Sequence, residues 1–361
     1  MTDWTRLTDF IDANECQWTR EPEATSEQWG IHLLDTPPHN TLLGPVFSRG
    51  APAGLICKNG ETLCQWGDIH RADMTFSVTK TCLALLTGVA VDRGLIPNID
   101  DPVYQYTDLA GFTDSHNRQI TFRHMLQFTS EWSGVCFGIP DQVDHYRTVA
   151  MQASPAGTKE NAKGNKRTLC KPGTHWEYND IRINQFSLAL MHIFQQPLPE
   201  VFKETIAEPI GVSNNWSWHG YKNSFVEING KQLQSVPGGG HWGGGLVIAP
   251  ADQALVGQLI LQHGLWQGRQ VISADWIRAM LTPCPIAPFY GFFTWLNTGN
   301  CISKAASAES FFAMGIGGQL IWHDPVNQTV GVFRWLADNS FETVIQLAAE
   351  QLGNSTTGNK Q

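Results

Sequence analysis

The sequence is poor in charge, because only 16% of its 361 residues are Asp, Glu, Lys or Arg. It has no basic stripe, and its formal net charge of −9 argues against nucleic acid as a partner. No apolar run reaches the roughly 18 residues that a membrane-spanning helix needs. These absences favour a globular protein whose partner is a small molecule rather than nucleic acid or a membrane.

Paired cysteines and a leader sequence are missing as well. The eight cysteines are scattered without a Cys-x-x-Cys pair, which is typical of reduced, mostly buried thiols in a cytoplasmic protein. The first residues have neither the basic nor the apolar region of a signal peptide. We therefore expect a cytoplasmic protein, or a periplasmic one if a leader has been removed.

Strand signals occur near both ends of the chain. The Asn59-Gly60 pair separates two β-rich runs, and this dipeptide is the strongest short-range signal for a hairpin. Alternating apolar and β-branched residues predict further strands in the C-terminal third, at residues 289–297, 317–324 and 329–338. The same sheet can therefore draw its strands from both ends.

The middle of the chain has helical spacing instead, from about Pro97 to Pro209. A length of 361 residues favours two domains at roughly 100–200 residues each. We predict an α/β (α+β) protein with a sheet domain made of residues 1–95 and 236–361. A mainly helical domain, residues 96–235, is inserted between the two parts.

Ser77 lies three residues before Lys80, where a strand-like segment turns into a long apolar helix that ends at Gly94. Residues at this spacing share a helix face, so the lysine amine can reach the serine hydroxyl. Serine needs a neighbouring base to act as a nucleophile, and burial can lower the pKa of a lysine enough for that role. The spacing alone slightly favours the alternative, a capping serine beside a solvated lysine.

Four ordered motifs favour the catalytic interpretation. Residues 74–106, which include Ser77 and Lys80, resemble the first motif of the serine β-lactamase and penicillin-recognising hydrolase family, in its class C and esterase-like branch. Residues 120–132, 171–180 and 239–261 are similar to further segments of this family. The resemblance implies a β-lactamase-like fold, an antiparallel sheet flanked by helices with an inserted helical domain. It implies no metal and no cofactor.

The resemblance also implies the roles of individual residues. Ser77 would be the acylated nucleophile, Lys80 its general base and Tyr178 a proton relay to the leaving group. Tyr221 is the alternative for the tyrosine, but the Pro-Gly pair before Tyr178 fits the family context better. Asp180 stands where the family has an asparagine that binds substrate. Either of two nearby amides is a candidate replacement for it, Asn179 or Asn184.

The third family motif places a cation on a strand beside the cleft, and here Ala313 occupies that position. Gly315 would let a substrate approach the strand, and the Ile316 N–H would complete the oxyanion hole with that of Ser77. Because the missing cation commonly holds a substrate carboxylate in this family, penicillins should bind poorly. We therefore expect an esterase or amidase with weak β-lactamase activity.

Tryptophans adjoin the matched motifs at Trp132, Trp176 and Trp242. They would shape an apolar acyl pocket over the nucleophile, in a cleft between the two domains. The alternative is that these side chains belong to the core. His241, between glycines next to Trp242, is a candidate substrate contact.

Three other functions compete with a serine esterase or amidase. A metal enzyme is disfavoured, since the histidines, His219, His241, His263 and His323, form no His-x-x-x-His pair with a nearby carboxylate. A non-catalytic protein of the same fold would not need Ser77, Lys80 and Tyr178 together, and a penicillin-binding protein is a further alternative. A true β-lactamase would lack its usual cation.

Overall fold

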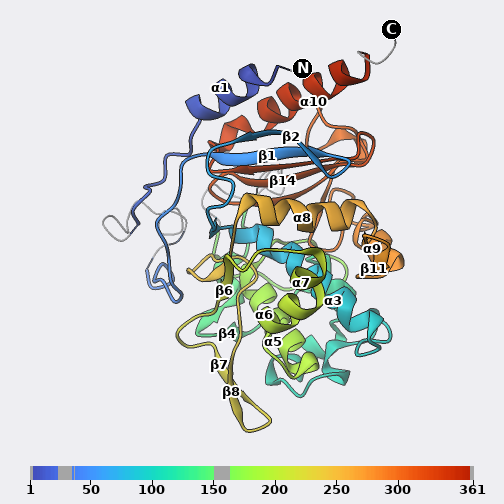
Figure 1. Ribbon diagram of the computed structural model, residues 1–361. Helices are drawn as coiled ribbons and strands as arrows, with labels where there is room; N and C mark the ends of the chain where they lie inside the picture. The colour runs from blue at the N-terminus through green and yellow to red at the C-terminus, as the bar shows by residue number, and fades with distance from the viewer. Residues whose placement is uncertain (1–2, 23–34, 36, 150–162, 358–361) are drawn as a thin grey trace.

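The computed structural model describes residues 3–22, 35, 37–149 and 163–357 (Figure 1). Its main sheet has six antiparallel strands in the order β12-β13-β14-β15-β1-β2. They are β1 (Ala53–Lys58), β2 (Glu61–Trp66), β12 (Trp295–Leu296), β13 (Phe311–Gly315), β14 (Gln319–Asp324) and β15 (Thr329–Arg334). Both ends of the chain thus contribute to one sheet, and the predicted α+β class with an antiparallel sheet is confirmed.

The predicted hairpin is present, and its turn explains the Asn-Gly signal. Asn59 and Gly60 have φ angles of 53° and 84°, a left-handed conformation that asparagine and glycine tolerate best. The strand predicted at residues 289–297 is mostly wrong, because only Trp295–Leu296 pairs in the sheet. Aromatic residues there pack into the core instead of alternating across a strand.

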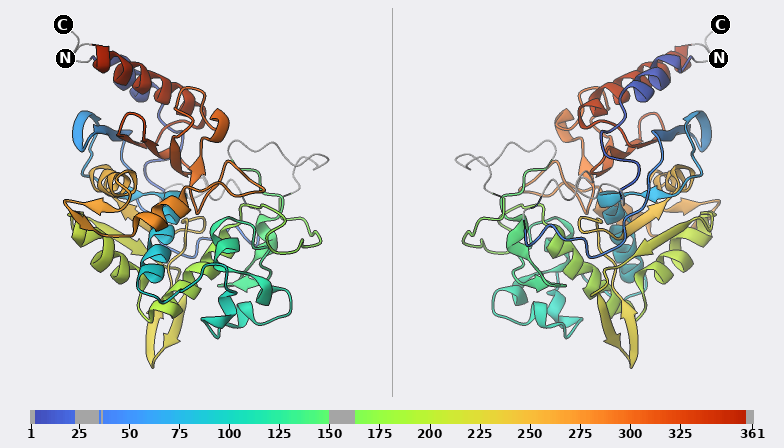
Figure 2. Two further views of the ribbon diagram at one scale, coloured as in Figure 1. Left: turned by 90° about the vertical axis from the view of Figure 1, so that its right-hand side faces the viewer. Right: turned by 90° about the vertical axis from the view of Figure 1, so that its left-hand side faces the viewer.

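Helices cover both faces of the main sheet (Figure 1). The terminal helices α1 (Thr5–Ala13) and α10 (Phe341–Thr357) pack together on one face, so the two ends of the chain lie side by side (Figure 2). Helix α8 (Pro250–Leu261) packs on the other face against β1, β14 and β15. Below it lies α3 (Thr79–Asp92), whose residues are almost all buried, and α9 (Ala274–Met280) packs beside it.

Residues 96–235 contain helices and several short strands. The helices are α4 (Phe122–Leu126), α5 (Asp180–Phe194), α6 (Leu198–Phe202), a π-helix (Lys203–Ala207) and α7 (Glu208–Ile210). The strands are β4 (Val135–Cys136), β5 (Ile139–Pro140), β6 (Trp216–His219), β7 (Phe225–Ile228) and β8 (Lys231–Gln234). The boundaries at 95 and 236 stay predictions.

A second sheet joins this middle segment to both sides of the chain. Strand β9 (Gly245–Ile248) pairs with β6 on one side and with β3 (Asp73–Met74) on the other. Another small hairpin is formed by β10 (Leu265–Trp266) and β11 (Arg269–Gln270). Because β3 directly precedes Ser77, this sheet fixes the start of α3. No helix within the described residues is long and apolar enough to cross a membrane.

His323 on β14 is a buried histidine that predicts acid sensitivity. Its ring stacks on Phe311 with a centroid distance of 4.3 Å, and its Nε2 has no hydrogen-bond partner among the described residues. Burial lowers the pKa of His323 from 6.5 to about 3. The unfolded chain therefore binds a proton between these pH values that the folded protein does not. This contribution to the free energy of unfolding falls as the pH falls below 6.5.

We expect His323→Leu to remove this part of the pH dependence. The free energy of unfolding of the wild type, minus that of the variant, should fall by up to about 1.4 kcal/mol per pH unit between about pH 6 and about pH 4. Denaturant titrations at several pH values measure it. His70→Leu, at an exposed position, is the control and should give a flat difference. A flat difference for His323→Leu as well would contradict the prediction.

Candidate active site

Ser77 lies at the centre of a 3₁₀ turn, Phe76–Val78, that leads directly into α3. Phe76 has a φ angle of 49°, an unusual conformation for a bulky residue. Thr75 fixes the turn, because its N–H donates to the carbonyl oxygen of Leu246 and its hydroxyl lies 3.2 Å from that of Thr79. Ser77 is therefore held at the start of a buried helix, as predicted.

Lys80 contacts the hydroxyl of Ser77 one turn along. Its Nζ donates to Ser77 Oγ at 2.9 Å and to Asp180 Oδ1 at 2.6 Å, and its side chain is buried. Burial acts to lower the pKa of Lys80, but the charge of Asp180 and the hydroxyl of Tyr178 outweigh it and raise that pKa above 10.5. The expectation of a lowered lysine pKa is wrong, because it took no account of a buried carboxylate partner.

Tyr178 lies beside Lys80, just before the N-terminus of α5. The Lys80 Nζ is 4.9 Å from the centre of its ring, and the guanidinium carbon of Arg147 is 5.2 Å from it. The ring stacks on Phe128 at a centroid distance of 4.4 Å and lies nearly parallel to Trp295. Two cations and two aromatic rings thus hold the phenol in one orientation.

Tyr221, the alternative tyrosine, is not among the residues that line a cavity with Ser77. It is buried, and its hydroxyl accepts a hydrogen bond from Asn184 at 3.2 Å. The other amide considered, Asn179, caps α5 by accepting from the Arg182 N–H and donates to the Asp141 carbonyl. Both amides are used by the fold, so neither of them replaces the family's asparagine as a free group.

Asp180 is the first residue of α5 and is almost fully buried. Besides Lys80 it binds Arg147, at 2.5 Å, and it lies 3.6 Å from His241 Nδ1. Burial acts to raise the pKa of Asp180, but the charges of Lys80 and Arg147 hold it well below the usual range. Asp180 is therefore a charged partner of Lys80, which an asparagine at this position would not be.

Further charges continue this cluster outward from Asp180. Arg147 also binds Asp144 at 3.1 Å, and Asp144 lies 3.4 Å from Lys163. Lys163 and His241 both contact Asp35, a residue more than a hundred positions away from either. His241, predicted as a substrate contact, is buried between two carboxylates instead. The cluster alternates positive and negative groups, so each charge is paired.

Sequence reasoning missed Arg147, Asp144, Lys163 and Asp35. They lie in polar segments that resemble exposed loops, and only the tertiary structure brings them into the charge cluster around Asp180. One residue of the sequence could have indicated them, because Asp180 stands where the family has a neutral asparagine. A buried extra charge needs partners, and these residues supply them.

The glycine-rich run packs against the same groups. A Cβ at Gly239 would lie 2.6 Å from Lys80 Nζ and 3.2 Å from Ser77 Oγ. Trp242, from the same run and predicted to contact substrate, is fully buried, and its Nε1 donates to the His39 carbonyl oxygen at 2.7 Å. Gly239 therefore packs directly against Ser77 and Lys80, whereas the tryptophan belongs to the core.

We expect Gly239→Ala to reduce activity while the protein still folds. Its φ is not in the left-handed region, so the alanine backbone is allowed, but its methyl group would displace Lys80 from Ser77. The value of kcat/KM should fall by about 10²-fold, the scale of a misplaced catalytic group. Gly353→Ala, where no described residue lies within 4 Å of the added methyl group, is the control. Full activity of Gly239→Ala would show that the contact does not position Lys80.

The end of β13 approaches Ser77 from the other side. A Cβ at Gly315 would lie 2.4 Å from the Thr75 carbonyl oxygen and 3.2 Å from the Ser77 backbone nitrogen, so only glycine fits here. Ile316 follows it and lines the same cavity as Ser77. Ala313, at the position of the family's cation, is buried. The structure thus brings Gly315 and Ile316 to Ser77, and their role toward an oxyanion stays a prediction.

A cavity of about 640 Å³ opens beside Ser77 and Tyr178. Its apolar lining residues are Val149, Trp295, Met314, Ile316, Leu320, Leu336, Ala337 and Phe341. Of the described residues that line it, none is one of the three tryptophans predicted to form an acyl pocket. Trp132 and Trp242 are buried in the core, as the alternative expected, and Trp176 packs in an aromatic cluster with Phe289 and Trp295. The apolar pocket exists, but other residues form it.

Glu131 lies in the matched segment 120–132 and has an unusual backbone conformation for a residue with a side chain. It has a φ angle of 51°, the conformation that glycine adopts most easily. Its buried carboxylate binds Arg167 at 2.5 Å and 2.6 Å and Arg182 at 3.0 Å. Burial acts to raise the pKa of Glu131, but these cations and a backbone N–H lower it to about 2. The ion pairs offset the strain.

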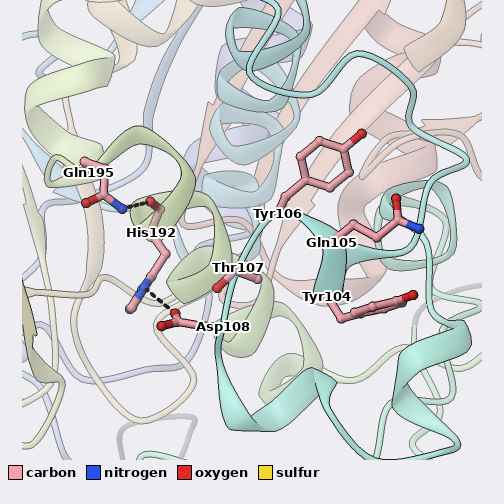
Figure 3. Close-up of a pocket in the computed structure, with 7 residues that line it drawn as sticks. All are labelled: Tyr104, Gln105, Tyr106, Thr107, Asp108, His192 and Gln195. Carbon is pink, nitrogen blue, oxygen red and sulfur yellow. Dashed lines mark hydrogen bonds and ion pairs between the residues drawn. The ribbon is translucent and has the colours of Figure 1, made fainter.

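A second cavity, of about 370 Å³, lies at the surface (Figure 3). Tyr104, Tyr106 and His192 line it, and His192 is 4.0 Å from Asp108. None of the predicted site residues is there. The described part of the chain holds no group of three or more His, Cys, Asp and Glu side chains that could bind a metal ion. The cavity at Ser77 is therefore the candidate active site.

Comparisons with known proteins identify the family and the fold. The β-lactamase family model matches residues 74–340, which include Ser77, Lys80, Tyr178 and Gly315. A search of curated proteins gave no significant match. The fold is similar to a β-lactamase from Mycobacterium bovis, with a TM-score of 0.56 and 20% identity over 86% of this chain and 97% of that one.

Two other solved structures with this fold are described as hydrolases. EstCE1, a hydrolase with promiscuous acyltransferase activity, has a TM-score of 0.58 and 14% identity over 96% of this chain and 98% of that one. A D-stereospecific amidohydrolase from Streptomyces has a TM-score of 0.53 and 16% identity over 80% of this chain and 89% of that one. Because the family model covers well over half of the sequence, the chain belongs to the β-lactamase family.

Proposed function

We propose that the protein is a serine hydrolase that cleaves an ester or amide bond through an acyl-enzyme on Ser77. The observation that carries this proposal is the 2.9 Å contact between Ser77 Oγ and Lys80 Nζ at the edge of an apolar cavity. A hydroxyl held this way beside a cation and a phenol is the arrangement that activated serines need. The fold it shares with a hydrolase and an amidohydrolase supports the same reaction class.

Tyr178 takes the proton of Ser77 in this mechanism. Lys80 is a poor base here, because as an ammonium its N–H groups donate to Ser77 and Asp180, with the Tyr178 hydroxyl as a further partner. The charges of Lys80 and Arg147 both lie close to the ring of Tyr178. The phenolate then acts as the base, and Lys80 positions both oxygens.

The chemical steps follow from these positions. Ser77 Oγ attacks the substrate carbonyl carbon as its proton passes to the Tyr178 oxygen, and the carbonyl oxygen becomes an oxyanion near the Ser77 and Ile316 N–H groups. The carbonyl carbon then releases the leaving alcohol or amine, which takes the proton from Tyr178. A water molecule then attacks the carbonyl carbon of the acyl-enzyme and loses a proton to Tyr178. The bond from this carbon to Ser77 Oγ breaks, the acid is released, and the proton passes from Tyr178 to Ser77.

β-Lactams are expected to be poor substrates. The position of the family's strand cation holds Ala313, and the cations that line the cavity, Arg147 and Lys163, are already paired with carboxylates. A penicillin carboxylate would therefore lose its hydration without gaining a partner. A true β-lactamase is the less favoured alternative for this reason.

A substrate panel tests this function. We expect hydrolysis of p-nitrophenyl butyrate with a kcat/KM in the range of roughly 10⁴ M⁻¹s⁻¹ or above, and for nitrocefin a value at least about 10²-fold lower. Absence of turnover for all esters and amides, with labelling of Ser77 by a penicillin probe, would support a penicillin-binding protein instead. Efficient turnover of nitrocefin would assign the protein to the β-lactamases proper.

A further inference from the structure

The charged side chains that line the active-site cavity differ in whether they are paired with another charge. Of the described residues that line the cavity, three have a charged side chain: Arg147, Lys163 and Asp338. The two cations enter from the middle segment and Asp338 from the turn before α10. Any charged substrate group in this cavity meets these three side chains first.

Both cations are already paired with buried carboxylates. Arg147 is bound by Asp144 at 3.1 Å and by Asp180 at 2.5 Å. Lys163 is bound by Asp35 and lies 3.4 Å from Asp144. The carboxylates are almost fully buried, so a substrate cannot displace them without leaving a charge unpaired in the interior. The two cations belong to the structure.

Asp338 differs from both cations. Its side chain is exposed, and it has no hydrogen bond or ion pair with any other described residue. The cavity wall around it is apolar, formed by Leu336 and Phe341 on its own segment and by Met314 on the facing strand β13. An ionised carboxylate beside apolar walls is less screened than one in open water. Asp338 therefore attracts cations and repels anions in this part of the cavity.

We propose that Asp338 selects the substrate charge, so that the cavity accepts esters or amides with an apolar body and a positively charged or neutral group and disfavours carboxylates. This inference rests on the proposed hydrolase function and adds to it the chemical class of substrate. A quaternary ammonium fits best, because its methyl groups suit the apolar walls while its charge pairs with Asp338. Asp338 is a specificity residue in this proposal and takes no part in the chemical steps.

Isosteric p-nitrophenyl esters test the charge preference of the acyl side. The cationic ester is that of 4-(trimethylammonio)butyrate, the neutral one that of 5,5-dimethylhexanoate, and the anionic one that of glutarate. For the alcohol side, butyrylcholine is compared with 3,3-dimethylbutyl butyrate. Each kcat/KM is divided by the rate of the uncatalysed hydroxide reaction, which removes the intrinsic reactivity of the ester. We expect the order cationic, neutral, anionic on at least one side.

Asp338→Asn then assigns the preference to one residue. It should lower the cationic-to-neutral ratio by about three- to fivefold, the size of a partly exposed ion pair, through a loss of kcat/KM for the cationic ester. Glu309→Gln removes the same charge at an exposed position before β13 and should change neither value. Added salt should reduce the ratio of the wild type and leave that of Asp338→Asn unchanged.

The outcomes separate this proposal from the function on which it rests. Loss of neutral-ester hydrolysis in Ser77→Ala supports the hydrolase whatever the charge order is. A preference for the glutarate ester, or a cationic-to-neutral ratio that Asp338→Asn leaves unchanged, overturns the role of Asp338 alone. If no ester is hydrolysed at all, binding of tetramethylammonium and of acetate, measured by calorimetry, still decides whether Asp338 selects cations.

Discussion

Replacement of Ser77 by alanine should lower kcat/KM for p-nitrophenyl butyrate by roughly 10⁴-fold or more. The reason is that the bond-forming atom is lost, and Lys80 and Tyr178 have no other hydroxyl to activate. The free energy of unfolding should hardly change, since the Ser77 side chain gives up one hydrogen bond, the 2.9 Å contact with Lys80. Initial rates and denaturant titrations on the same preparations measure both.

A fluorophosphonate gives an independent readout of the same prediction. It should add one adduct to the wild type, located at Ser77 by peptide mass spectrometry, and none to Ser77→Ala. Ser133→Ala, at an exposed position, is the matched control and should keep both turnover and the adduct. Ser77→Ala with wild-type rates would refute the central assignment. An adduct without any turnover in the wild type would favour a binding protein that keeps a reactive serine.

Lys80→Ala is a less informative variant, although its loss of activity should be nearly as large. Removing Lys80 leaves the buried Asp180 without one of its cations, and breaking a buried pair typically costs about 3–5 kcal/mol of stability. Activity and folding would then fall together. For this reason the nucleophile is tested at Ser77, and the proton transfer is tested at Asp180.

The sequence predicts the family and the fold class, because local features define both. The Ser77–Lys80 pair needs only one helical turn, and Asn59-Gly60 needs only the conformation of two residues. The alternation in β14 and β15 is a property of each strand by itself. The antiparallel sheet and its flanking helices follow from these elements, and the comparisons confirm the family.

The electrostatic state of the site could not be predicted in this way. Whether Lys80 is neutral or charged depends on Asp180, which is 100 residues away in the sequence, and Asp180 in turn depends on Arg147. Likewise, a tryptophan beside a motif can lie in the core or in the cavity, depending on tertiary packing. Trp242 is in the core, whereas Trp295, which no motif indicated, lines the cavity.

Asp180→Asn should reveal which group accepts the Ser77 proton. The wild-type pair has a lowered pKa at Asp180 and a raised pKa at Lys80, so its stabilisation is fully present between 3.8 and 10.5, the ordinary values. It is lost only as the pH falls through the folded pKa of Asp180 or rises through that of Lys80. Asparagine removes the opposing charge, and burial then lowers the pKa of Lys80.

The contribution of Lys80 to the stability of the variant should therefore depend on pH above about pH 7, where the contribution of the wild-type pair does not. The free energy of unfolding of Asp180→Asn should be about 3 kcal/mol lower near pH 7, because the ammonium is buried without this partner. The deficit should shrink as the pH rises, since the folded variant then loses the Lys80 proton before the unfolded chain does. Asp141→Asn, a buried aspartate outside the Lys80 contacts, controls for a general loss of packing.

The activity of Asp180→Asn should fall by about 10²-fold near pH 7 and fall further toward about pH 9, as Lys80 loses the charge that stabilises the Tyr178 phenolate. A Lys80 that acts as the base gives the opposite result, because the neutral amine becomes more abundant in the variant and kcat/KM rises with pH. The pH profiles of wild type, Asp180→Asn and Asp141→Asn therefore decide between the two bases. With Asp180 in place, the geometry favours Tyr178, since the Lys80 ammonium donates to both Ser77 and Asp180.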